Sequence, residues 1–101
     1  ITNCIITDNS AEDADGGGIS CMRDSSPTIT NCTITGNWGG IASRWGSSPI
    51  IKNCTISGNR DEGIYCSRDS SLIINNSILW ANTPFQIRED GASINVRYTD
   101  V

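Results

Sequence analysis

A nine-residue segment that recurs along the chain constrains the fold more than any other feature of the sequence. Residues 29–37 read ITNCTITGN and residues 51–59 read IKNCTISGN, and looser copies occupy residues 1–9 and 73–82. The copies start 28, 22 and 22 positions apart, and they close on Asn9, Asn37, Asn59 and Asn82. A regular period of about 20 to 50 residues indicates a repeat protein, in which each unit buries its apolar side against the next. The sequence therefore predicts a solenoid.

Each repeat contains three short apolar pieces with turn-forming residues between them. A Gly-Ile step follows the nine-residue segment, as at Gly40-Ile41, and a Ser-rich corner comes next, as at residues 47–49. No piece is long enough for a capped helix, whereas Ile and Thr favour strands. Three strands and three corners form one coil of a parallel β-solenoid. We therefore expect residues 1–101 to be one all-β segment of about four coils, each of about 22 residues.

Two other solenoids fit the repeat less well. Left-handed β-helices use six-residue periods, so a three-sided coil takes about 18 residues, fewer than this chain uses. Leucine-rich repeats share the first four anchor positions, which here are Ile29, Cys32, Ile34 and Asn37. Their final apolar anchor would fall on Gly39, Asp61, Ala11 and Pro84. The remainder of each repeat also lacks helical periodicity, so we exclude both alternatives.

The order Ile-x-Asn-Cys/Asn-Thr-Ile-x-x-Asn, followed by Gly-Ile, resembles the right-handed parallel β-helix repeats of the pectate-lyase-like superfamily. More narrowly, it is similar to repeats in large bacterial and archaeal surface proteins, including polymorphic outer-membrane types. The resemblance covers essentially the whole chain. It implies a right-handed parallel β-helix with three short strands per coil. It also implies a structural or adhesive segment of a secreted protein, with an extracellular or cell-surface location.

The resemblance leaves a second function open, because sugar-processing relatives hold polysaccharide on the strand that follows Gly-Ile. The chain is alternatively a carbohydrate-binding or polysaccharide-cleaving module that acts on an acidic polysaccharide. Aromatic rings suit sugar rings and guanidinium groups suit carboxylates. The predicted sugar contacts are Trp38, Arg44, Trp45 and Tyr65. An embedded acidic pair near Arg44 and Tyr65 would favour this second function.

The Asn-Cys pair at the centre of each repeat predicts a corner. Ile29 and Ile34 both belong in the core, yet they are five positions apart, and side chains alternate along a strand with a period of two. A corner must therefore lie between them, and Asn tolerates the left-handed conformation of a tight corner. The next residue is expected to point inward as a small filler. The expected corner ladder is Asn3, Cys4, Asn31, Cys32, Asn53, Cys54, Asn75 and Asn76, with Tyr98 as a further inward residue.

The same alignment predicts three inward-facing columns of the core. They are Ile19, Ile41, Ile64 and Phe85; Cys21, Ser43, Cys66 and Ile87; and Ile34, Ile56 and Ile78. Five cysteines cannot all pair within one chain. We expect all five to be reduced thiols in the core.

An acidic loop is the candidate metal site. Residues 10–18 offer Glu12, Asp13 and Asp15, and Ca²⁺ takes about six to eight oxygen ligands. Asp61 and Glu62 are expected two coils along, roughly 10 Å away. The loop lacks the alternating Asp pattern of an EF-hand, so a solvated acidic loop is the favoured interpretation and no other cofactor is indicated.

Catalytic residues are not recognisable in these coils. The chain has no His, which excludes Ser-His and Cys-His chemistry within it. No acidic cluster matches the sugar-cleaving mechanisms of the resembled superfamily either. The sequence therefore favours a protein without enzymatic activity.

Composition and the ends of the chain indicate the expected partners. The net charge of −4 argues against a nucleic-acid surface, and no apolar run is long enough to span a bilayer. Ile1 and Val101 both fall in the middle of a coil, so we expect further coils of the chain or other copies stacked end to end, as in a filament. Asn31, Asn53 and Asn75 begin glycosylation sequons, but the corner and the following strand explain this pattern without glycans.

Overall fold

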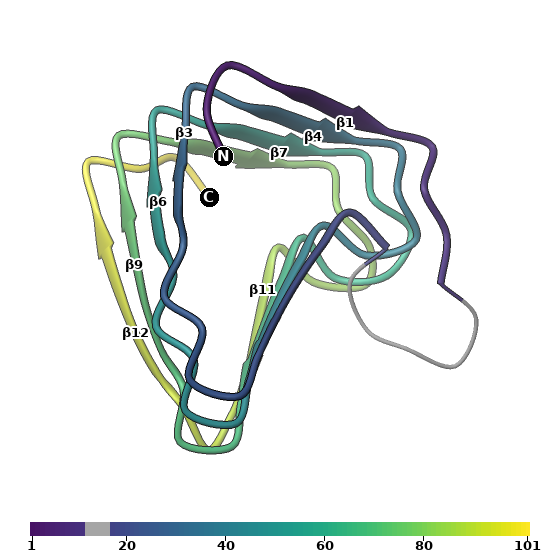
Figure 1. The fold of residues 1–101 in the computed structure, drawn as a ribbon. Coiled ribbons are helices and arrows are strands. Elements are labelled where there is room, and N and C mark those ends of the chain that lie inside the picture. Colours follow the sequence, from purple (N-terminus) through teal and green to yellow (C-terminus); the bar gives the residue numbers. More distant parts are fainter. Residues whose placement is uncertain (12–16) are drawn as a thin grey trace.

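The computed structural model describes residues 1–11 and 17–101, and that part of the chain contains no helix. Figure 1 looks along the common axis around which its strands are wound. The described residues form twelve strands, which are β1 (Ile5–Thr7), β2 (Ile19–Met22), β3 (Thr28–Thr30), β4 (Thr33–Thr35), β5 (Ile41–Arg44), β6 (Ile50–Lys52), β7 (Thr55–Ser57), β8 (Ile64–Ser67), β9 (Ser71–Asn75), β10 (Ile78–Trp80), β11 (Ile87–Asp90) and β12 (Ser93–Arg97).

Three parallel sheets form the three sides of the solenoid. Their orders are β1-β4-β7-β10, β2-β5-β8-β11 and β3-β6-β9-β12, so each strand pairs with the strand three places further along the chain. From β1 to β10 the chain makes about three turns. The predicted all-β parallel solenoid with three strands per coil is confirmed, and the expected number of four coils is slightly too high.

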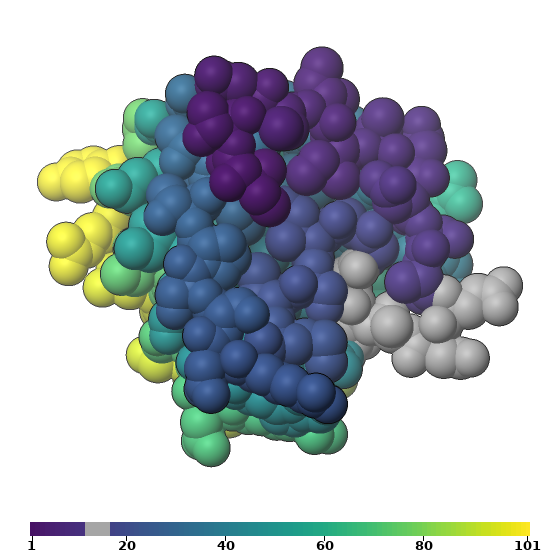
Figure 2. All heavy atoms as spheres, in the orientation of Figure 1, coloured from purple at the N-terminus to yellow at the C-terminus, as the bar shows by residue number. Residues whose placement is uncertain are grey.

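Alternation along the strands sends every second side chain into one core. In β2, for example, Ile19 and Cys21 are buried while Ser20 and Met22 are exposed. Figure 2 shows that side chains fill the space that the ribbon of Figure 1 leaves open between the sheets. Each fully buried aliphatic side chain contributes about 1.5–3 kcal/mol relative to an exposed one, so packing between coils is a main source of stability. These side chains are Ile29, Ile34, Ile41, Ile51, Ile56, Ile64, Leu72 and Ile74.

Left-handed residues form the corner between the β3-β6-β9-β12 sheet and the β1-β4-β7-β10 sheet. In the first three repeats φ lies between 53° and 55° at Asn3, Asn31 and Asn53. In the fourth repeat the left-handed residue is Asn76, with φ 51°, and not Asn75 as expected. Asn75 instead ends β9 and pairs with Lys52 of β6.

One additional residue in the turn between β7 and β8 causes this shift. Asn37 and Asn59 are 22 positions apart, whereas Gly40 and Gly63 are 23 positions apart. Ile41 donates its backbone N–H to the carbonyl of Gly63, which shows that the two glycines occupy neighbouring coils. Pairing beyond this turn therefore runs one position later than a constant 22-residue period predicts.

The predicted core columns are misplaced in the fourth coil for the same kind of reason. Leu79, and not Ile78, pairs with Ile56, because the added residue moves the register by one. Ile78 is accordingly 49% exposed.

The fourth coil also lacks the glycine that marks the Gly-Ile step in the other coils. Ile87, and not Phe85, pairs with Ile64, and Phe85 is 52% exposed. Glu89 then takes the place expected for Ile87, opposite Cys66. Without the glycine marker, the sequence predicts a turn before β11 that is two residues shorter than the observed one.

The residue after each corner hydrogen-bonds to the carbonyl two residues before it. Sγ of Cys32 and Sγ of Cys54 each lie 3.2 Å from that oxygen. Because of the one-residue shift, the later members are Ser77 and Thr99, each one position beyond the expected residue. Cysteine, serine and threonine thus fill one position because each is small and carries a donor.

All five cysteines are free thiols. Four are buried, whereas Cys4 on the first coil is exposed, contrary to the expectation of a fully buried set. Burial raises the pKa of the Cys21, Cys54 and Cys66 thiols, so they remain protonated.

A second ladder, made of asparagine side chains, runs through the turns after β1, β4, β7 and β10. Asn37 donates its N–H and Nδ2 to Oδ1 of Asn59 at 3.0 and 3.2 Å, and Asn59 donates likewise to Asn82 at 3.1 and 2.8 Å. Asn9 stands at the start of this ladder and donates to Asn37. The closing asparagine of each repeat therefore holds its turn to the next coil.

Candidate functional site

The predicted sugar-contact face is the outward side of the β2-β5-β8-β11 sheet. Arg44 ends β5, Tyr65 lies in β8, and Arg88 in β11 pairs directly with Tyr65. The guanidinium carbons of Arg44 and Arg88 lie 5.1 and 5.2 Å from the centre of the Tyr65 ring. A cation within about 6 Å of a ring centre is attracted to its face. Tyr65 is therefore held between two cations that come from the neighbouring coils.

Trp45 lies at the corner that follows β5 and forms a second stack of the same kind. The guanidinium carbons of Arg23 and Arg68 lie 5.7 and 5.3 Å from the centre of its ring. Arg23 directly follows β2 and Arg68 directly follows β8, so the three residues occupy equivalent corners of successive coils. This stack borders the face where its strands end.

An acidic pair lies in the turn between β7 and β8. Oε1 of Glu62 accepts a hydrogen bond from Nη1 of Arg88 at 2.8 Å, and the Glu62 side chain is only 4% exposed. Burial alone would raise the pKa of Glu62, but the hydrogen bond from Arg88 and other hydrogen bonds lower it overall. Burial and the neighbouring Glu62 carboxylate raise the pKa of Asp61. The two adjacent carboxyl groups therefore shift in opposite directions.

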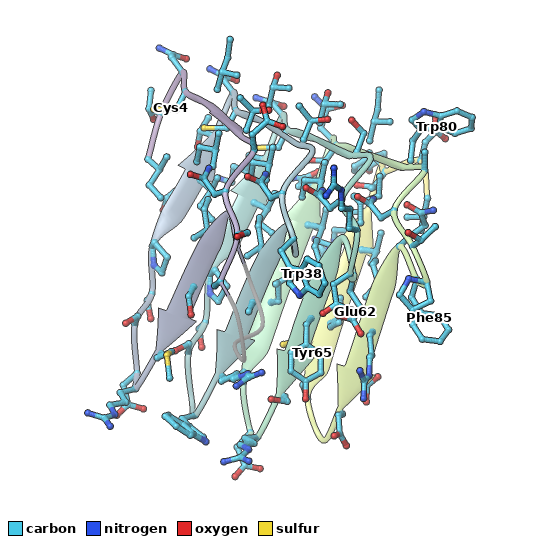
Figure 3. The ribbon with its side chains drawn as sticks, turned by 90° about the vertical axis from the view of Figure 1, so that its right-hand side faces the viewer. Cys4, Trp38, Glu62, Tyr65, Trp80 and Phe85 are labelled. Carbon is cyan, nitrogen blue, oxygen red and sulfur yellow. The ribbon has the colours of Figure 1, made fainter. Side chains whose placement is uncertain are left out.

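Arg88 connects this acidic pair to Tyr65, because it bonds Glu62 and lies over the Tyr65 ring. Figure 3 shows Glu62, Tyr65 and Trp38 on one side of the solenoid, with Trp80 well away from them. The sequence alone did not place the pair on this face. The only feature of the sequence that could have indicated this position of Asp61 and Glu62 is the added residue in the turn just before Gly63.

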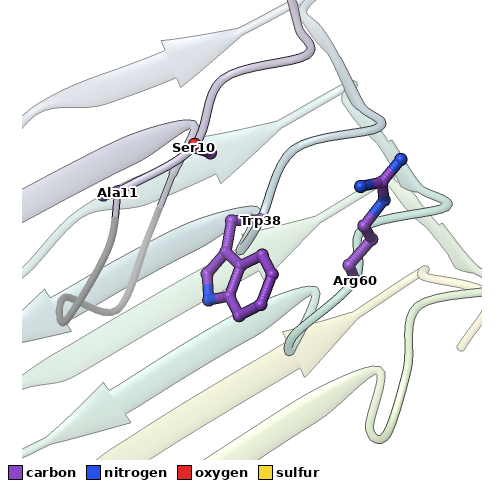
Figure 4. Close-up of a pocket in the computed structure, with 4 residues that line it drawn as sticks. All are labelled: Ser10, Ala11, Trp38 and Arg60. Carbon is purple, nitrogen blue, oxygen red and sulfur yellow. The ribbon is translucent and has the colours of Figure 1, made fainter.

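Trp38 lies in the turn that precedes β5, and its side chain is 47% exposed. Ser10 and Arg60 occupy the equivalent positions in the neighbouring coils, since each follows an asparagine of the ladder. Together with Ala11 these residues line a cavity of about 300 Å³, shown in Figure 4. The backbone N–H of Asp61 donates to the carbonyl of Trp38, which places this cavity beside the acidic pair.

The family model for right-handed β-helix regions matches residues 1–100. The chain belongs to the right-handed β-helix family. Comparison with curated proteins and with solved structures found no match. Because one fold hosts many functions, the family defines the architecture of this β-helix and not its function.

The candidate Ca²⁺ ligands Glu12, Asp13 and Asp15 lie outside the described residues of the β-helix, so that metal site stays a prediction. Within residues 1–11 and 17–101, no three His, Cys, Asp or Glu side chains are grouped so that they could hold a metal ion. The same part of the chain has no helix with the length and apolar character needed to cross a membrane.

The face of this β-helix combines ring surfaces with guanidinium groups in successive coils. Arginine can donate paired hydrogen bonds to a carboxylate, and an aromatic ring can lie against a sugar ring. The structure brings Arg44 and Tyr65 into contact, whereas Trp38 and Trp45 lie at opposite ends of β5. Sequence reasoning missed Arg23, Arg60, Arg68 and Arg88, which become neighbours of the aromatic residues only through the register between coils.

Proposed function

We propose that this β-helix is a module that binds an acidic polysaccharide along the β2-β5-β8-β11 face. The observation that carries the proposal is the position of Tyr65 between Arg44 and Arg88. Stacking restricts both arginine side chains before any ligand arrives, so less conformational entropy is lost on binding. An extended polymer that lies along the axis meets cationic and aromatic groups in successive coils.

Glu62 orients Arg88 but leaves other N–H donors of the arginine unused by this contact. Arg88 reaches Glu62 through Nη1, and a guanidinium group has five N–H donors. The Arg88 side chain is 51% exposed, so its other donors can meet a uronate carboxylate. The buried carboxylate of Glu62 therefore acts as a positioning group for the cation in front of it.

Isothermal titration calorimetry with oligogalacturonate and a neutral galactose oligomer of equal length tests this proposal. We expect the acidic oligomer to bind at least about tenfold more tightly, which corresponds to about 1.4 kcal/mol. Tyr65→Leu should weaken binding, whereas Tyr65→Phe should retain it because the phenyl ring still stacks with both arginines. Arg97→Gln, on the β3-β6-β9-β12 sheet, is the matched control. Equal affinity for the two oligomers, or equal binding by Tyr65→Leu and wild type, would refute the proposal.

A structural or adhesive role is the second candidate, and a different face favours it. The outward positions of the β1-β4-β7-β10 sheet carry no charged side chain; they are Ile5, Thr7, Thr33, Thr35, Thr55, Ser57, Ile78 and Trp80. Ile5 is 77% exposed and Trp80 is 70% exposed. Large exposed apolar side chains on an uncharged surface favour contact with another protein. In this role the module would serve a secreted or cell-surface protein and join further coils or other copies of itself.

Sedimentation velocity over a range of concentrations tests the second candidate. If copies associate through this sheet, the sedimentation coefficient should rise with concentration in wild type and in Trp38→Ser, and Trp80→Ser should abolish the rise. A chain that stays monomeric at high concentration would rule this role out. Association that persists in Trp80→Ser would locate the contact at the ends of the solenoid.

A further inference from the structure

The positions that follow the ladder asparagines form a column of side chains with unlike chemistry. Ser10, Trp38 and Arg60 occupy this column in three successive coils. Backbone hydrogen bonds keep the coils in register, from Trp38 N to Asn9 O at 2.8 Å and from Arg60 N to Asn37 O at 2.9 Å. The column therefore presents a hydroxyl group, an indole ring and a guanidinium group in a fixed order.

The buried asparagine ladder fixes the backbone positions of this column, because each ladder asparagine directly precedes a residue of the column. Asn37 and Asn59 are almost completely buried, and each is hydrogen-bonded to the coil before it and the coil after it. Neighbouring strands are about 4.8 Å apart, so Ser10 and Arg60 are separated by roughly 10 Å along the axis. A site built on such a scaffold is formed before its ligand arrives, which reduces the entropic cost of binding.

The size and lining of the cavity limit the ligand. Its volume of about 300 Å³ lies at the lower end of the range for small-molecule pockets, which suits one ring and not an oligomer. Trp38 supplies an exposed aromatic face for the ring. Arg60 brings a guanidinium group to the lining of the cavity, and guanidinium groups pair well with carboxylates.

We infer that the pocket formed by Ser10, Trp38 and Arg60 binds a single pyranose ring that carries a carboxylate. The ring stacks on Trp38, the carboxylate accepts hydrogen bonds from Arg60, and Ser10 bonds a ring hydroxyl group. This inference rests on the proposed carbohydrate-binding function. It uses side chains that the Arg44–Tyr65–Arg88 stack does not, so the two can be tested separately.

The test is NMR titration of the full ¹⁵N-labelled chain with sodium D-galacturonate and, separately, with D-galactose. We expect galacturonate to shift the indole N–H signal of Trp38 with a Kd on the order of 1 mM, and galactose to bind at least about tenfold more weakly. Trp38→Leu and Arg60→Gln should each abolish the saturable binding of galacturonate. The matched controls Trp80→Leu and Arg97→Gln lie on the other two sheets and should bind as wild type does. Signal dispersion shows that each variant is folded.

The outcomes separate this inference from the proposed function. The proposed pocket is wrong if galactose binds as tightly as galacturonate, or if galacturonate still binds to Trp38→Leu. If Tyr65→Leu abolishes galacturonate binding and the two pocket variants do not, the ligand lies on the β2-β5-β8-β11 face, which is here called the main face. The proposed pocket is then wrong, while the proposed function stands. If oligogalacturonate does not bind but galacturonate still shifts Trp38, the pocket stands and the main face fails. Absence of any binding refutes both.

Discussion

Oε1 of Gln86 accepts a hydrogen bond from Nδ2 of Asn82 at 2.8 Å, the same distance at which Oδ1 of Asn82 accepts one from Asn59. The glutamine thus provides the acceptor that a further asparagine would provide. It does so from four positions along the chain, whereas the other rungs come from separate coils. The ladder of buried amides is therefore completed by a local contact.

Gln86→Met should destabilise the fold, because it keeps a long side chain but removes this acceptor. Asn82 is 3% exposed, and a buried donor without a partner costs about 1–3 kcal/mol. Urea denaturation should show a loss of that size in the free energy of unfolding. Gln86→Glu retains an acceptor oxygen and should lose less. Equal stability of the Met variant and wild type would show that water replaces the glutamine.

Asn59→Ala should be more damaging, because Asn59 is 1% exposed and bonds both neighbouring coils. Several buried groups lose their partners, so we expect a loss of about 3 kcal/mol or more in the free energy of unfolding. The comparison is Asn53→Ala at the exposed corner, where the left-handed conformation costs an alanine about 1–2 kcal/mol. Urea denaturation of both variants should rank them in this order, and the reverse order would contradict the role of the ladder.

Asp61→Asn and Glu62→Gln should have opposite effects on stability at pH 7. The raised pKa of Asp61 means that its contribution is present at low pH and is lost as the pH rises through that pKa, so a neutral amide should stabilise the fold. The lowered pKa of Glu62 means that its contribution is present above the pKa of an unperturbed glutamate and is lost as the pH falls through the lowered pKa, so Glu62→Gln should destabilise the fold at neutral pH. Free energies of unfolding measured from pH 3 to 8 test both signs. Parallel pH profiles for the two variants would show that the carboxyl groups are equivalent.

Cys4 should be the first thiol to react with Ellman's reagent in the folded protein. It is exposed, whereas the other four cysteines are buried, and burial raises the pKa of Cys21, Cys54 and Cys66. We expect one rapid thiol in buffer and five in urea. Cys4→Ser should remove the rapid phase alone. A second rapid thiol in that variant would mean that the core opens readily.

The repeat was enough to predict the parallel solenoid, because strand alternation and turn formation depend on residues that lie close together in the sequence of one coil. Ile29, Ile34 and their equivalents could be placed in the core from spacing alone. The fourth coil could not be aligned, because the added residue before Gly63 and the missing glycine before Ile87 change the register without changing the pattern.

The candidate site was predictable only where it depends on one strand. Arg44 and Tyr65 could be assigned to the outward face from alternation in β5 and β8. The contact between Glu62 and Arg88 spans 26 positions and two coils, so it depends on the register that the added residue shifts. Cross-coil contacts of this kind require the pairing of strands to be known.

The added residue between β7 and β8 has a consequence for how such a chain can change. Ile41 still pairs with Ile64, and Asn37 still bonds Asn59, on either side of the longer turn. The rungs thus tolerate a change of length that brings a carboxyl pair beside Tyr65 and Arg88 on the β2-β5-β8-β11 sheet. Evolution, or an engineer, can exchange the turn of one coil for a longer or differently charged one and keep every neighbouring coil as it was. The charge and shape of the surface can therefore change one turn at a time.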